Sequence, residues 1–66
     1  MTLEEQINEQ ENMILKAMKE NRSCSIIYKM FEIYEDLYAE IKHPTPQQEN
    51  SYIQIYFKYL GYSERN

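Results

Sequence analysis

Three kinds of side chain in this sequence could do chemistry: one histidine, one cysteine and a row of carboxylates. His43 stands directly before Pro44, and no cysteine, histidine or acid near it has the spacing of metal ligands. General acid–base catalysis also requires a second group beside the histidine, and the sequence offers none. We therefore expect His43 to close the preceding helix rather than to act as a catalytic or metal-binding residue.

Cys24 precedes a predicted helix, a position that can activate a thiol. A nucleophile needs a base close by, and His43 lies at the other end of that helix, about 28 Å away at 1.5 Å per residue. A partly buried structural cysteine is therefore the favoured interpretation. A single cysteine also excludes an internal disulfide framework.

Glu32, Asp36 and Glu40 follow one another at a spacing of four, so they share one face of a helix. A di-metal carboxylate site would also require a Glu-x-x-His motif, which is absent. We interpret the row as a solvated acidic face that can meet a basic partner. No metal, cofactor or enzymatic activity is expected.

The charge of the chain is unevenly distributed. Eleven acids against seven bases give a net charge of −4, and residues 1–42 carry nine acids and five bases, so the whole deficit lies there. Proteins that bind nucleic acid directly present a basic face, and the last predicted helix has Lys58 as its only base. A helix-turn-helix DNA-binding regulator is therefore the least favoured alternative.

A chain of 66 residues allows one helical domain, residues 1–66, whose core is marginal for stability. Self-association is a common remedy at this size. No stretch approaches the roughly 18 apolar residues of a membrane span, and the acidic N-terminus is unlike a signal peptide. We expect a cytoplasmic protein that does not contact the membrane.

The periodicity of apolar residues predicts three helices, over residues 3–20, 25–42 and 46–60. The second is apolar around most of its circumference, which is typical of a helix covered on two sides. Short connections favour antiparallel neighbours. The expected fold class is all-α: a small up-down-up three-helix bundle with the second helix at its centre, able to dimerise.

Capping residues mark the predicted helix ends. Thr2 with Glu5, and Thr45 with Gln48, have the spacing of capping boxes. Asn21 can adopt the left-handed conformation that closes the first helix. Ser23 and Ser25 are alternative caps for the second helix.

The first and third helices differ in their apolar rows. In the first, no apolar residue stands between Ile7 and Met13, so its N-terminal half is expected to pack weakly. In the third, Gly61 is expected to close the helix in the left-handed conformation, with Tyr62 folding back onto Phe57. Its apolar set, flanked by Tyr52, Ile55 and Tyr59, is expected to cover the second helix; it consists of Ile53, Tyr56, Phe57 and Leu60.

The chain has seven tyrosines, two phenylalanines and no tryptophan. Tyrosine combines a large contact area with a polar hydroxyl, which suits both the rim of a core and a protein interface. Both uses remain open for these rings. Together with the acidic row they form the set of expected partner-binding residues: Tyr28, Glu32, Tyr34, Glu35, Asp36, Tyr38, Tyr52, Tyr56 and Tyr59.

These features favour a small acidic helical module that binds another protein as a regulator or inhibitor. Its carboxylates could occupy a basic or nucleic-acid-binding surface of that partner. Inhibitors encoded by phages or mobile elements resemble it in size and charge, which is an analogy at the level of fold. The alternative is a homodimeric structural or assembly protein whose excess apolar surface forms a symmetric interface.

Overall fold

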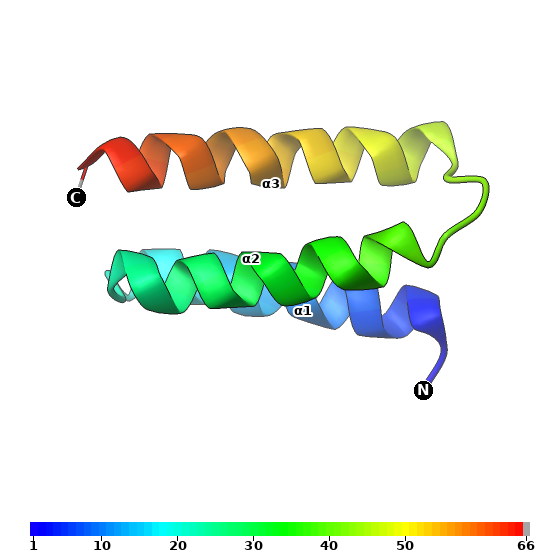
Figure 1. Ribbon diagram of the computed structural model, residues 1–66, viewed down its shortest axis with the longest axis horizontal. Coiled ribbons are helices and arrows are strands. Elements are labelled where there is room, and N and C mark those ends of the chain that lie inside the picture. The colour runs from blue at the N-terminus through cyan, green and yellow to red at the C-terminus, as the bar shows by residue number, and fades with distance from the viewer. Residues whose placement is uncertain (66) are drawn as a thin grey trace.

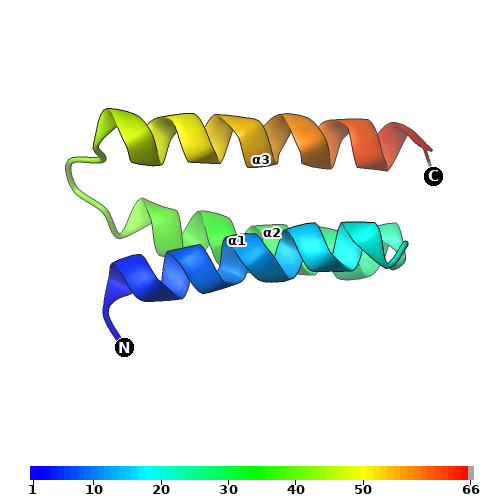
Figure 2. The same cartoon turned by 180° about the vertical axis from the view of Figure 1, so that it is seen from behind.

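The computed structural model describes residues 1–65 and contains three helices, α1 (Leu3–Lys19), α2 (Cys24–Ala39) and α3 (Pro46–Arg65). The helices run up, down and up along a common direction (Figure 1, Figure 2). α1 and α2 pack closely against each other, and α3 lies further away across both of them. The predicted all-α three-helix bundle is therefore confirmed.

Two reciprocal capping boxes begin the first and third helices, as predicted. The Glu5 backbone N–H donates to the Thr2 hydroxyl, and the Thr2 N–H donates to the Glu5 carboxylate, both at 3.1 Å. Thr45 and Gln48 repeat the arrangement ahead of α3, with distances of 2.8 and 3.1 Å. Each pair satisfies backbone donors that a helix start would otherwise leave without partners.

The connection between α1 and α2 depends on a single left-handed residue. Asn21 has a φ of 59°, as predicted, and within residues 1–65 no other non-glycine residue has a positive φ. The chain reversal lets the Arg22 N–H donate to the Ala17 carbonyl at 3.0 Å. Ser23 then caps α2 by accepting from the Ile26 N–H. A tight antiparallel pair follows.

α2 ends three residues earlier than the sequence predicts, at Ala39 rather than at 42. The N–H groups of Glu40 and Ile41 donate to carbonyls three residues back, which tightens and closes the final turn. Pro44 restricts the residue before it, His43, so it prevents the helix from continuing past residue 42 but does not account for the earlier end at Ala39. Ile41 still packs against the core from outside the helix.

α3 runs through Gly61 to Arg65, so the predicted end near residue 60 is wrong. Gly61 does not adopt positive φ, and Tyr62 does not fold back onto Phe57. Instead the Tyr62 ring is buried between Ala17 and Ile27, and its hydroxyl donates to the Arg22 carbonyl. Burial of this ring favours continuing the helix over closing it at the glycine.

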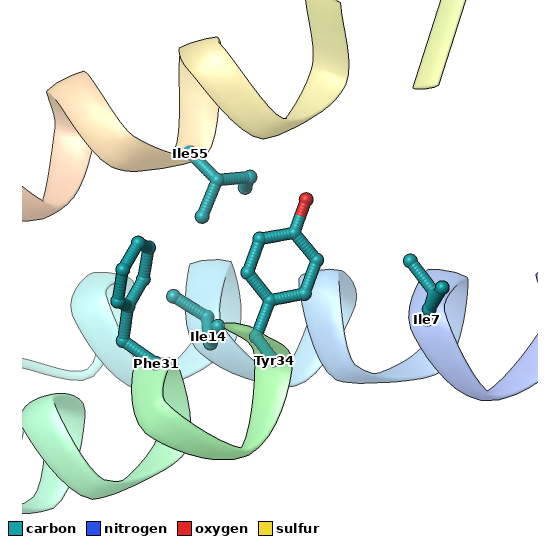
Figure 3. Packing of buried hydrophobic residues seen from close by; sticks show 5 residues of the cluster. All are labelled: Ile7, Ile14, Phe31, Tyr34 and Ile55. Carbon is teal, nitrogen blue, oxygen red and sulfur yellow. The ribbon is translucent and has the colours of Figure 1, made fainter. Parts of the chain in front are cut away.

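The core consists of two adjoining clusters. The larger joins all three helices and is drawn in Figure 3, where Phe31 and Tyr34 rise from α2 toward α3; its buried members are Ile7, Ile14, Phe31, Tyr34 and Ile55. The smaller lies beside the α1–α2 connection and is made by Ala17, Ile27 and Tyr62. Each of the three helices contributes at least one buried residue to both clusters.

The helical conformation of Gly61 predicts the sign of a substitution. A Cβ at this position would meet nothing within 4 Å, so Gly61→Ala is expected to stabilise the protein by about 0.5 kcal/mol through a smaller loss of backbone entropy. Urea denaturation measures the change. Asn21→Ala is the opposite control. It is expected to destabilise the protein, because the backbone at this position has a positive φ, which alanine adopts less readily than asparagine. Destabilisation by Gly61→Ala would instead indicate a left-handed helix end.

Candidate protein-interaction surface

Aromatic rings fill the space between α2 and α3. Phe31 stacks on Tyr59 with centroids 4.6 Å apart, and Tyr38 stacks on Tyr52 at 4.7 Å. The ring centroids of Tyr52 and Tyr34 are also close, 5.7 Å apart. Stacked and edge-on ring pairs are favourable beyond the area they bury. This layer of rings positions α3 and therefore decides which of its side chains reach the surface.

Tyr34 is the most deeply placed of the predicted partner-binding residues, with 0% of its surface exposed. Its hydroxyl donates to Glu11 Oε2 at 2.6 Å. Burial, and then the adjacent Glu11 carboxylate, raise the pKa of Tyr34 well above the ordinary value. Tyr34 thus supports the surface from beneath instead of forming part of it.

Two polar residues in the middle of α1 form hydrogen bonds to α2. Gln10 is only 9% exposed, and its Nε2 donates to the Met30 carbonyl at 3.0 Å. Glu11 accepts the Tyr34 hydroxyl one residue further on. Sequence reasoning missed both roles. The available signal was that position 10 falls between Ile7 and Ile14 on the apolar face, where a polar residue requires a specific partner.

Tyr38, Tyr52 and Tyr59 are half-buried at the edge of the ring layer. The Tyr52 hydroxyl donates to Glu35 Oε2 at 2.8 Å. Burial and this carboxylate together raise the pKa of Tyr52 to about 12. Burial, and then the charge of Glu49, also raise the pKa of Tyr38. Glu35 is therefore committed to an internal bond, although it is exposed.

α3 is rotated relative to the sequence-based expectation. The row turned inward comprises Tyr52, Ile55, Tyr59 and Tyr62. The apolar set expected to cover α2 is instead exposed, with exposed fractions of 49% for Ile53, 40% for Tyr56, 65% for Phe57 and 38% for Leu60. Spacings of three and four keep these four residues on one face of α3. The result is an apolar stripe along the outside of the bundle.

Carboxylates on α2 stand beside this stripe. Tyr28, Glu32 and Glu35 follow at spacings of four and three and share one face of the helix, and Tyr28 is 52% exposed. Tyr56 lies at the boundary with α2, since its ring is 6.0 Å from Phe31. Glu32 and Asp36 are exposed, and within residues 1–65 neither has an ion-pair or hydrogen-bond partner. Their charges are therefore available to a binding partner.

His43 and Cys24 lie away from this surface. His43 is exposed in the connection after α2, and Cys24 is half-buried against the smaller core cluster. Among the residues that the structure describes, no three histidine, cysteine, aspartate or glutamate side chains are grouped to hold a metal ion. No helix in the same part of the chain is long and apolar enough to span a bilayer.

In comparisons with known proteins, the chain matches no family model, no curated protein sequence and no solved structure.

The bond between Tyr34 and Glu11 predicts a loss of stability on removing one oxygen. Tyr34→Phe keeps the ring but leaves the Glu11 carboxylate without its donor, so the unfolding free energy should fall by about 1.5 kcal/mol. Tyr28→Phe is the matched control, because its ring is 52% exposed and no change is expected. Equal small effects for both variants in urea denaturation would show that the bond contributes nothing.

The raised pKa values predict alkaline sensitivity. Below pH 10 Tyr34, Tyr38 and Tyr52 are protonated in both states. Above it these residues ionise first in the unfolded chain, because their folded pKa values are raised, to about 12 for Tyr52. Stability should therefore fall as the pH rises from 10 toward 12. Near-ultraviolet absorbance should resolve a late-titrating set, and Tyr52→Phe should remove one member of it. Titration of all seven tyrosines in one step would contradict the assignment.

Proposed function

We propose that this protein is a small acidic interaction module that regulates or inhibits another protein by binding it through one surface. We name this surface the α2–α3 face. It combines the aromatic and acidic residues of α2 with the exposed stripe of α3 and consists of Tyr28, Glu32, Asp36, Ile53, Tyr56, Phe57 and Leu60. Tyr38, Tyr52 and Tyr59 support it from its half-buried edge, with Tyr34 beneath.

The exposed stripe on α3 is the observation that carries the proposal. Ile53, Phe57 and Leu60 are 38–65% exposed, although another row of the same helix is buried. Single exposed apolar residues are ordinary, but a contiguous row on one helix face is typical of a binding site. Tyrosine and phenylalanine at its centre are residues enriched at interfaces. The stripe would supply binding energy, and the neighbouring charges would select the partner.

The free carboxylates favour a basic partner. Glu32 and Asp36 lie about 6 Å apart along α2 at a rise of 1.5 Å per residue. They belong to residues 1–42, which carry the entire net charge of −4. A positively charged protein surface, including one that binds nucleic acid, would complement them and would be occluded when occupied. Regulation by competitive occupation of such a surface is the mechanism that we propose.

The proposal is tested by comparing capture of a host protein by the wild-type chain and by surface variants. Tyr56→Ser and Glu32→Lys should each weaken binding of the captured protein about tenfold, and added salt should weaken wild-type binding further. Glu4→Lys is the control, since it changes the net charge equally from an exposed position on α1. Titration calorimetry with the purified partner measures the affinities.

Three outcomes would overturn the proposal. Capture that survives both Tyr56→Ser and Glu32→Lys would place the binding surface elsewhere. An affinity that does not change with salt would remove the role of the carboxylates. If Glu4→Lys weakened binding as much as Glu32→Lys does, the partner would be responding to net charge alone and not to the α2–α3 face.

A further inference from the structure

A second exposed apolar surface follows the seam between α1 and α2, on a different side of α2 from Tyr28 and Glu32. Met13 is 47% exposed, Ile26 44% and Ile33 51%. Ile26 and Ile33 stand about two turns apart along α2, with Met30 half-buried between them. We call this row, with Met13, the α1–α2 face. α3 does not cover it, because the inward row of α3 packs on the opposite side of these helices.

Two shallow hollows lie along this face, and Met13 lines both of them. The hollow nearer the α1–α2 connection is bordered by Lys16 and by the ion pair between Arg22 and Glu20, whose atoms are 3.4 Å apart. The hollow nearer the N-terminus is bordered by Glu9. Apolar side chains, chiefly Ile26 and Met30 in the first and Ile33 and Leu37 in the second, form their floors.

The two ends of the face therefore differ in charge. The first hollow has two basic side chains and one acidic side chain at its border, whereas Glu9 is the charged side chain that lines the second. Within residues 1–65, neither Lys16 nor Glu9 has an ion-pair partner in its own chain. A surface with opposite charges on either side of an apolar centre is complementary to itself after a two-fold rotation.

We propose that the α1–α2 face binds a second copy of this chain, with the two-fold axis passing beside Met13. Lys16 follows Met13 by three residues and Glu9 precedes it by four, which places them about 4.5 and 6 Å from the axis along α1. The rotation brings Lys16 of each copy opposite Glu9 of the other, with an offset of only about 1.5 Å. The apolar residues around Met13 then meet across the axis and exclude water.

A second copy fits this face better than it fits the α2–α3 face. Glu32 and Asp36 on the α2–α3 face are both acidic, so two copies meeting there would bring like charges together. The α1–α2 face carries both signs and pairs them by symmetry. The dimer would leave both α2–α3 faces free, so the inference does not depend on the proposed function and can fail without it.

Charge reversal tests the pairing, with sedimentation equilibrium at low ionic strength as the measurement. Wild type should dimerise, whereas Glu9→Lys and Lys16→Glu should each raise the dimer dissociation constant about tenfold or more, because like charges then meet twice per dimer. Mixing these two variants should produce a heterodimer, since every meeting pair is again opposite in charge. Combining both changes in one chain should restore the homodimer. Circular dichroism confirms that each variant is folded.

Substitution on each face separates this site from the exposed stripe of α3. Met13→Glu should abolish dimerisation by placing two carboxylates at the axis, whereas Phe57→Glu should leave it unchanged. A wild-type chain that is monomeric at high micromolar concentration would overturn the proposal. So would single variants that do not associate on mixing, or a dimer that Phe57→Glu dissociates and Met13→Glu does not.

Discussion

Tyr34 imposes the constraint on which the packing of this bundle depends, because its ring is fully buried while its hydroxyl requires an acceptor. The Glu11 carboxylate meets that requirement from α1, and Gln10 beside it bonds the Met30 carbonyl. These two polar residues occupy the stretch of α1 that has no apolar side chain. The stretch of α1 without apolar side chains thus contributes two hydrogen bonds to α2, and hydrogen bonds have stricter distance and angle requirements than apolar contacts.

The same ring layer sets the distance and the rotation of α3. Phe31 and Tyr34 project from α2 toward α3, so α3 packs against aromatic side chains and its backbone does not approach α2 closely (Figure 3). Tyr52 and Tyr62 then hold the rotation from the two ends of α3, through a bond to Glu35 and a bond to the Arg22 carbonyl. Turning these tyrosines inward turns Phe57 and its neighbours outward. The stripe is exposed because α3 has this rotation, and not because α3 lacks apolar residues.

Two apolar surfaces remain on a bundle of this size, and their charges distinguish them. The α2–α3 face has carboxylates without partners, which favours a basic protein. The α1–α2 face has Lys16 on one side of Met13 and Glu9 on the other, which favours its own symmetric copy. The two surfaces share no residue, so binding at one would not block binding at the other. A dimer would therefore present two binding faces for the partner, and avidity would follow if the partner is itself repeated.

The sequence by itself determined the helices and most of their ends, because capping boxes, a left-handed Asn21 and the prolines act through neighbouring residues alone. It also determined the all-α class, since the apolar period is local. Only the tertiary structure decided which row of α3 faces inward, because the row with Ile53 and the row with Ile55 are both apolar. It likewise decided that the helix passes through Gly61, where burial of Tyr62 outweighs the local tendency of glycine to end a helix. The contacts that favour both outcomes, including the hydroxyl partners Glu35 on α2 and the Arg22 carbonyl in the α1–α2 connection, lie outside α3, so no periodicity within α3 records them.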